Sequence, residues 1–229
     1  MPDTAQTANP ETGPETGPSE PHGPTTSVGP AESATARATL LSRKTPWTLK
    51  ENIARVIWMT FGTVAWKLLP PARSALIRLF GGKVGRACRF ASGVEVTIPW
   101  NVTIGDNVRV REGAVIYSLG PITIGNDCVL DTRAHLCAGT HDMTDPTFPL
   151  VKPPITLGKG CFVGIDAYIA PDVELGDGCR VWPRASVYKS APPGVCLKGN
   201  PARPIDPEAE ARDEAEQVRR EREAGVGRP

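Results

Sequence analysis

The sequence predicts an all-β solenoid, and three observations lead to this fold class. Between residues 157 and 187 an aliphatic residue returns at every sixth position, and a small or compact residue lies four places after each. Six is an even number, so every repeat restores the same side-chain orientation in a strand, whereas a helix would rotate these side chains out of line. A fixed short period is typical of a solenoid in which each repeat covers its neighbour's apolar face. The aliphatic positions are Leu157, Val163, Ile169, Leu175, Val181 and Val187.

The same six-residue period extends upstream to Val84, with two slips of two residues and one larger interruption. Slips of this size fit extra residues at a corner of the coil. If three faces make one turn, the 16 aliphatic positions give about five turns of parallel β-helix. The larger interruption adds 15 residues between Leu136 and Leu157, and a long loop on a rigid scaffold is where we expect chemistry.

Composition divides the chain into four segments. Residues 1–45 are rich in Pro, Thr, Glu, Gly and Ala, and we expect them to be disordered because they have little apolar surface to bury. Residues 46–83 have a helical pattern that is interrupted at Pro70-Pro71 and ended by Gly81-Gly82. Residues 84–205 form the solenoid with a loop at 142–156, and residues 206–229 form a charged helix or tail.

Charge and cysteine content restrict the function class and the compartment. The formal net charge of +1 provides no global field for nucleic acid or an anionic membrane. Four of the six cysteines, Cys88, Cys128, Cys161 and Cys179, occupy the small inward position of the repeat, where a thiol acts as a compact hydrophobe. The first forty residues lack the apolar segment of a secretory signal. We therefore expect a reduced, cytoplasmic protein.

The helical segment leaves two interpretations open. Its apolar residues could pack against the solenoid, or residues 47–69 could make peripheral contact with the inner face of a membrane. The run from Ile53 to Leu69 has 17 residues and includes Arg55 and Lys67, which makes it a poor membrane span.

Four short segments carry a resemblance to a known family. They are Arg78–Gly85 (RLFGGKVG), Ile98–Asn101 (IPWN), Leu136–Asp142 (LCAGTHD) and Gly199–Arg203 (GNPAR). The chain resembles the hexapeptide-repeat acyltransferases and, more narrowly, the O-acetyltransferases of the colanic-acid-biosynthesis type. The resemblance implies a left-handed parallel β-helix, acetyl-CoA as co-substrate, and a homotrimer with active sites between subunits.

The resemblance also implies the catalytic residue. His141 occupies the place of the family's catalytic histidine, where the chain leaves the coil. A neutral imidazole suits a general base because it accepts the hydroxyl proton and returns it to the leaving thiolate. His135 lies six residues earlier at the same phase, so we expect it on the surface or lining a cleft. Cys137 offers an acyl-cysteine alternative, which the resemblance disfavours because it implies direct transfer.

Acceptor-binding candidates cluster around the loop. Asp142 and Asp145 could orient the imidazole, bind acceptor hydroxyls or simply cap the loop through Asx-turns. Further candidates share an aromatic or amide side chain that suits a sugar ring, although each could equally be packing. These candidates are Trp100, Asn101, Tyr117 and Phe148.

The phosphates of CoA require cations and backbone amides. Lys189 matches the lysine after the final hexapeptide in related acetyltransferases, and Arg203 closes the GNPAR segment. Weaker candidates, each of which could be an ordinary solvated or structural residue, are Arg184, Lys198, Asn200 and Gly164. The chain departs from the family at Trp182-Pro183 and at Arg133.

The sequence thus predicts an acetyl-CoA-dependent O-acetyltransferase that acts on a hydroxyl of a sugar, a glycan or a related small molecule. Transfer to an amine, or of another acyl group, remains open as an alternative. A non-enzymatic trimeric scaffold is a second alternative. A metalloenzyme of the γ-carbonic-anhydrase kind is disfavoured because it needs three zinc-binding histidines and the solenoid offers two, so we expect no metal.

Overall fold

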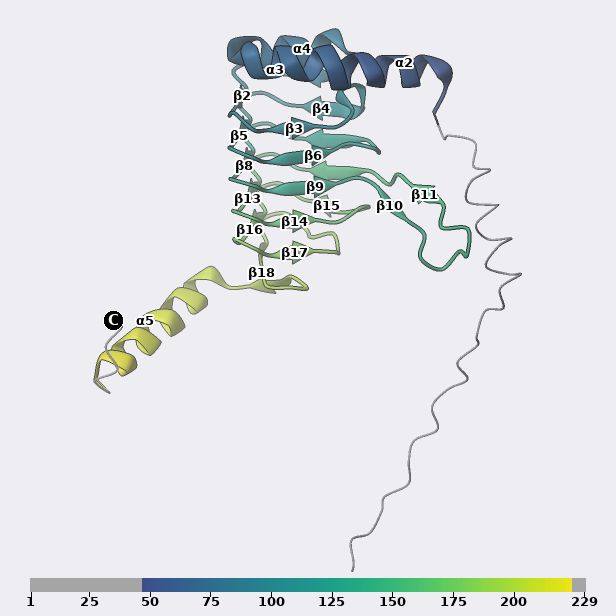
Figure 1. Ribbon diagram of the computed structural model, residues 1–229. Helices are drawn as coiled ribbons and strands as arrows, with labels where there is room; N and C mark the ends of the chain where they lie inside the picture. Colours follow the sequence, from purple (N-terminus) through teal and green to yellow (C-terminus); the bar gives the residue numbers. More distant parts are fainter. Residues whose placement is uncertain (1–46, 224–229) are drawn as a thin grey trace, which may run out of the picture. The chain divides into compact units, whose positions relative to one another are not determined.

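The computed structural model describes residues 47–223, and the prediction of disorder for residues 1–45 lies outside this range. Its centre is a solenoid of short strands stacked in three parallel sheets (Figure 1). Sheet A consists of β1 (Lys83–Val84), β4 (Val102–Ile104), β7 (Ile122–Ile124), β12 (Ile155–Leu157) and β15 (Glu174–Leu175). Sheet C consists of β3 (Glu95–Val96), β6 (Val115–Tyr117), β9 (His135–Cys137), β14 (Tyr168–Ile169) and β17 (Ser186–Val187).

Sheet B is the longest of the three. It consists of β2 (Arg89–Phe90), β5 (Arg109–Val110), β8 (Val129–Leu130), β13 (Phe162–Val163), β16 (Arg180–Val181), β18 (Cys196–Lys198) and the antiparallel β19 (Arg203–Ile205). Sheets A and C thus have one strand for each of the five expected turns, and sheet B adds one further parallel strand. The predicted left-handed parallel β-helix is confirmed.

The six-residue aliphatic ladder forms the core of the solenoid. Leu157, Val163 and Ile169 begin this ladder, and all its members through Val187 are buried. Successive turns pair in register, as in Leu157 opposite Leu175 and Val163 opposite Val181. Each inward side chain therefore stacks on an aliphatic residue of the next turn, and burial of these stacks supplies the main driving force for folding.

The interruptions of the ladder all fall at one corner, where the chain passes from sheet C to sheet A; we call it the C–A corner. The first slip forms a short 3-10 helix, η3 (Pro99–Asn101), and the second spans Ser118–Pro121. Ser118 ties the two together because its hydroxyl bonds both the N–H and the carbonyl of Ile98 at 2.9 Å. The 15-residue interruption leaves the same corner as a hairpin of β10 (Thr140–His141) and β11 (Leu150–Val151).

Helices cover the first turn of the solenoid. They are α2 (Leu49–Ile57), the π-helical turn η1 (Trp58–Gly62), α3 (Thr63–Leu68), the 3-10 turn η2 (Pro70–Ala72) and α4 (Arg73–Leu79). Thr48 and Glu51 form a reciprocal capping box that fixes the start of α2.

Two tryptophans anchor the helices to the solenoid. The wider π turn keeps Trp58 and Trp66 on one face, and both are buried. A Cβ atom at Gly62 would lie 2.5 Å from the Trp58 ring, so glycine is required for this packing. The Trp58 indole N–H donates to the Val96 carbonyl at 2.8 Å, which joins the helices to β3.

Arg73 is a buried charge that links helix and solenoid. Its guanidinium donates to the Trp66 carbonyl at 3.0 Å and to the Phe90 carbonyl at 2.7 Å, and only 4% of the residue is exposed.

At the other end of the solenoid, the helix α5 (Pro207–Glu223) follows β19, and Glu210 of this helix forms an ion pair with Lys198.

We predict that Arg73→Met lowers the free energy of unfolding by about 3 kcal/mol, because it leaves two buried carbonyls without their charged donor. Urea unfolding followed by tryptophan fluorescence measures this change, since Trp58 and Trp66 lie beside the site. Arg109→Met, at an exposed position of β5, is the matched control. Equal unfolding midpoints for the two variants would contradict the prediction.

Candidate active site

The hairpin at the C–A corner presents His141. Thr140 pairs with Val151 and His141 with Leu150 in antiparallel register. A cation–π contact holds the chain just after β11, because the Lys152 ammonium lies 3.6 Å from the centroid of the Trp47 ring. The hairpin is therefore a structured extension of the solenoid, and it projects from the stacked strands (Figure 1).

The imidazole of His141 is held in one orientation by Phe148. Its Nδ1 lies 2.8 Å from the Phe148 carbonyl oxygen, and the two rings stack with centroids 5.0 Å apart at 15°. A carbonyl oxygen can only accept a hydrogen bond, so Nδ1 carries the proton in this contact. The neutral ring then has its lone pair on Nε2, and the residue is exposed. This is the tautomer that a general base at Nε2 requires.

Sequence reasoning assigned Phe148 to the acceptor pocket and missed its carbonyl. The backbone of Phe148 has a φ of +52°, and its N–H donates to the Asp145 carbonyl at 2.8 Å. This turn directs the carbonyl of Phe148 to His141 across the hairpin. A backbone carbonyl carries no side-chain signature, so the residue pattern could not indicate it.

Asp142 and Asp145 both close turns in the loop. Asp142 accepts from the Thr144 amide at 2.9 Å and its hydroxyl at 2.6 Å. Asp145 accepts in the same way from Thr147, at 2.7 and 2.8 Å. The hydrogen bonds from Thr144 hold the pKa of Asp142 below its usual value. These contacts are Asx-turns, one of the roles that the sequence left open for the two residues, and they give the hairpin tip its shape.

The other acceptor candidates lie along the same corner. Trp100 belongs to η3 and packs close to Gly81. A Cβ atom added at Gly81 would lie 3.3 Å from the Cβ of Trp100. Asn101 donates to the carbonyls of Ser118 and Leu119 at 3.0 and 2.9 Å, which closes the neighbouring turn of the corner. Tyr117 ends β6, directly opposite Cys137 of β9. The structure therefore places Tyr117 on the turn next to the hairpin, and Trp100 and Asn101 one turn further along the same corner.

The outward face of sheet C is rich in aromatic rings. His135 lies edge-on to Tyr168, with ring centroids 5.5 Å apart, and edge-on to Tyr117 at 6.3 Å. Its Nε2 is buried and has no hydrogen-bond partner among the residues described. Cys137 lies on the same face, where its thiol donates to the Gly139 carbonyl at 3.3 Å.

The predicted CoA-binding residues divide between the two edges of sheet C. Lys189 follows β17 at the C–A corner, two strands beyond β9 in the stack, and is exposed. The others lie at the corner between sheets B and C, which we call the B–C corner. They are Gly164, Arg184, Lys198, Asn200 and Arg203. Within one chain, sheet C therefore separates these five residues from His141.

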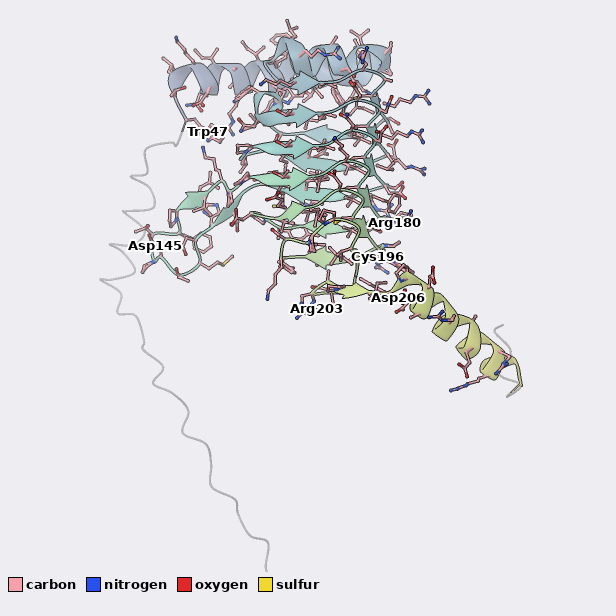
Figure 2. The ribbon with its side chains drawn as sticks, turned by 180° about the vertical axis from the view of Figure 1, so that it is seen from behind. Trp47, Asp145, Arg180, Cys196, Arg203 and Asp206 are labelled. Atoms are coloured by element: carbon pink, nitrogen blue, oxygen red, sulfur yellow. The ribbon has the colours of Figure 1, made fainter. Side chains whose placement is uncertain are left out.

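Contacts at the B–C corner already engage two of these residues. The Lys198 ammonium lies 5.0 Å from the centroid of the Trp182 ring and pairs with Glu210. Gly164 is buried, and a Cβ atom there would lie 2.7 Å from the Pro183 nitrogen. Glycine at this position is therefore required by the close approach of successive turns. Arg203 remains exposed on β19 (Figure 2).

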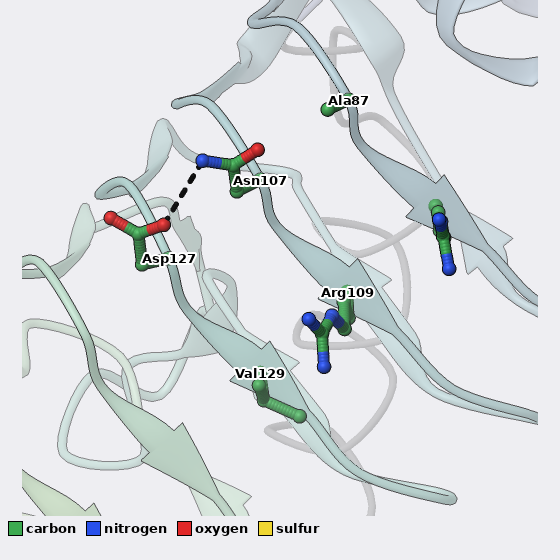
Figure 3. A pocket seen from close by; sticks show the side chains of 6 residues that line it. Ala87, Asn107, Arg109, Asp127 and Val129 are labelled. Atoms are coloured by element: carbon green, nitrogen blue, oxygen red, sulfur yellow. Dashed lines mark hydrogen bonds between the residues drawn. The ribbon is translucent and has the colours of Figure 1, made fainter.

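A hollow lies on sheet B, away from the hairpin. It has a volume of about 370 Å³, and its lining includes Arg109 and the hydrogen-bonded pair Asn107 and Asp127 (Figure 3). Arg89, which pairs with Arg109 in the strand register, also lines it. None of the predicted site residues lines it.

Within residues 47–223, no cluster of potential metal ligands is present, and no helix is long and apolar enough to cross a membrane.

The sequence of this chain is similar to that of a known protein family. Residues 154–189 match the family model described as bacterial transferase hexapeptide (six repeats). The Escherichia coli K12 protein WcaF, named as an acetyltransferase of colanic acid biosynthesis, is 39% identical over 148 residues. The match covers 63% of this chain and 81% of WcaF. The chain belongs to the hexapeptide-repeat acyltransferases, in the branch that includes WcaF.

Solved structures agree on the fold. A maltose O-acetyltransferase from Clostridium difficile 630 superposes with a TM-score of 0.64 at 19% identity, over 69% of this chain and 88% of that one. A galactoside acetyltransferase in complex with coenzyme A gives a TM-score of 0.61 at 22% identity, over 76% and 89%. At these identities the superpositions support the architecture alone.

We predict a pH dependence of stability that comes from His135. Burial lowers the pKa of its imidazole in the folded chain below the ordinary value of about 6.5. As the pH falls through the interval between these two pKa values, the unfolded chain binds a proton that the folded chain does not, so stability falls. Below the folded-state pKa this loss is complete, and above about pH 6.5 it is absent.

Urea unfolding from about pH 8 to about pH 5 measures this dependence. The variant His135→Gln should lack the corresponding part of the stability loss, while His141→Gln, which removes an exposed imidazole, should keep it. Identical pH profiles for the wild type and His135→Gln would contradict the prediction.

Proposed function

We propose that this acyltransferase is an acetyl-CoA-dependent O-acetyltransferase, that its acceptor is a hydroxyl of a sugar, glycan or related small molecule, and that His141 is the general base. The observation that carries the proposal is the hydrogen bond from Nδ1 of His141 to the Phe148 carbonyl. This bond leaves Nε2 free to accept a proton. The hairpin that carries His141 is exposed, and the chain belongs to an acyltransferase family. Relatives named for O-acetyl transfer to galactosides and for colanic acid biosynthesis support the choice of acceptor.

In the proposed reaction His141 alone carries the proton from the acceptor to CoA. Nε2 of His141 accepts the acceptor's hydroxyl proton while the oxygen attacks the thioester carbonyl, and a tetrahedral intermediate forms. Collapse of the intermediate breaks the carbon–sulfur bond, and the imidazolium returns its proton to the CoA thiolate. The Phe148 carbonyl accepts from Nδ1–H throughout, so it favours the imidazolium that forms when Nε2 takes the proton. Direct transfer of this kind needs no acyl-cysteine.

The division of the candidate residues supports a cyclic homotrimer. His141 and Lys189 lie at one edge of sheet C, and the remaining CoA candidates lie at the other. A cyclic assembly that sets the C–A corner of one subunit against the B–C corner of the next would combine the two sets in a cleft. The aromatic face of sheet C suits such an interface, because aromatic residues are enriched at interfaces.

The residues at both corners fit the chemistry of CoA. Lys189 and Arg203 are exposed cations that could bind phosphate groups, and neither is engaged in an ion pair among the described residues. Acetyl-CoA as donor is further supported by relatives whose structures contain acetyl-CoA or CoA.

We place the reaction in the cytoplasm because all six cysteines are free thiols.

We predict that His141→Gln lowers kcat by about 10²- to 10⁴-fold, the usual contribution of a general base. Release of CoA, followed with a thiol reagent over a panel of glycosides and nucleotide sugars, measures the change. Lys159→Gln, an exposed position between sheets A and B, is the control and should keep the wild-type rate. If His141→Gln retains near-full turnover, the assignment of the base fails.

We predict that Lys189→Ala and Arg203→Ala each raise KM for acetyl-CoA by about tenfold, because each removes one charged contact to phosphate. The acceptor KM should stay unchanged, since these cations are assigned to the donor. Initial rates at varied acetyl-CoA, with Lys159→Ala as the control, test this. An equal effect on both KM values would contradict the assignment to CoA.

A further inference from the structure

The N-terminal helices carry a long apolar surface that faces away from the solenoid. Its residues all belong to α2, η1 and α3, and each is between 43% and 76% exposed. We call this surface the outer stripe. It consists of Leu49, Ile53, Val56, Ile57, Phe61, Val64 and Leu68.

The outer stripe is continuous because of the way the helices are anchored. Trp58, Gly62 and Trp66 are buried against the solenoid, so the opposite side of the same helical run faces outward. The π turn at η1 keeps both sides in line from Leu49 to Leu68. Twenty helical residues extend about 30 Å, and Figure 1 shows α2 and α3 lying along one end of the strand stack.

Such a surface is unusual for a protein that stays in water. Monomeric soluble proteins seldom expose contiguous apolar patches beyond a few hundred Å², and larger patches indicate an interaction site. The helix capping and the tryptophan anchors hold the stripe in place, so it is not a frayed segment. Something apolar is therefore expected to cover it.

The charges around the stripe identify the partner. Residues 47–92 contain eight Lys and Arg and one acidic residue, although the whole chain has a net charge of only +1. Lys50 and Lys67 are exposed at the two ends of the stripe. An apolar face with flanking basic residues is the pattern of a helix that lies in the plane of an anionic membrane surface.

Two other ways of covering the stripe fit less well. The N-terminal segment, residues 1–46, offers few large apolar side chains for the purpose: Met1, Val28, Leu40 and Leu41. A second copy of the chain, docked stripe to stripe, would bring together the basic residues of two helical runs, which are Lys50, Arg55 and Lys67 in each copy. Like charges at close range oppose such a contact, whereas anionic headgroups would neutralise them.

We propose that the outer stripe docks this protein on the surface of an anionic phospholipid bilayer. The apolar side chains of the stripe enter the boundary between headgroups and acyl chains. Lys50 and Lys67 extend their charged ends to the lipid phosphates, as long basic side chains do at interfaces. This inference goes beyond the proposed reaction and does not depend on it, because binding to lipid is measured without acetyl-CoA or an acceptor.

Sedimentation of the full chain with vesicles tests the proposal. It should bind vesicles of phosphatidylcholine mixed with phosphatidylglycerol, and added salt or the double variant Lys50→Gln/Lys67→Gln should weaken the binding. It should bind pure phosphatidylcholine vesicles more weakly. Failure to sediment with the mixed vesicles at low salt would overturn the proposal.

A pair of matched substitutions tests whether the stripe itself makes the contact. Phe61→Gln should lower the partition coefficient on mixed vesicles about tenfold, because an aromatic side chain leaves the interface. Met143→Gln is the control, since Met143 on the hairpin is 77% exposed and Phe61 is 76% exposed. Both changes are at exposed positions, so circular dichroism should show unchanged folding.

Two outcomes of this comparison would count against a lipid partner. One is equal vesicle binding by Phe61→Gln and the wild type. The other is a smaller oligomer for Phe61→Gln in light scattering without any change in vesicle binding. The second result would assign the stripe to contact between copies of this chain.

Discussion

Every part of the structure depends on the parallel ladder between successive turns of the solenoid. The backbone pairs in register, and each inward aliphatic side chain rests on the one in the next turn. No turn could bury its apolar edge alone, so stability grows only as turns are added. The two ends need separate protection: helices anchored by Trp58 and Arg73 cover the first turn, and β19 folds back on β18 at the last.

The candidate active site lies where this ladder is interrupted. Extra residues collect at the C–A corner, first as η3, then as a two-residue slip and finally as the His141 hairpin. A corner tolerates insertions because the strands on either side keep their pairing. The insertion carries its own order, through the Asx-turns of Asp142 and Asp145 and the carbonyl of Phe148. The imidazole is thereby oriented by backbone, and a rigid scaffold supports it.

Three surfaces of the molecule lie in different places and suit different contacts. The aromatic face of sheet C, between the corners that hold the predicted donor-binding residues, suits a neighbouring subunit. The hairpin at the C–A corner carries the exposed His141 beside that face. The outer stripe and its basic neighbours lie on the helices, so membrane docking would leave both other surfaces available. Net charge alone misses this arrangement, because the positive charge of residues 47–92 is balanced elsewhere in the chain.

The sequence alone determined the solenoid, its approximate number of turns and the place in the chain of the long insertion, because a period of six fixes which side chains face inward. The LCAGTHD segment singled out His141 through resemblance. Only the tertiary structure decided that the Phe148 carbonyl holds the imidazole, since a turn geometry brings together atoms that no residue type encodes. It also decided that the apolar helical residues divide into a buried and an exposed side, because the π turn and the packing of Trp58 and Trp66 set that rotation.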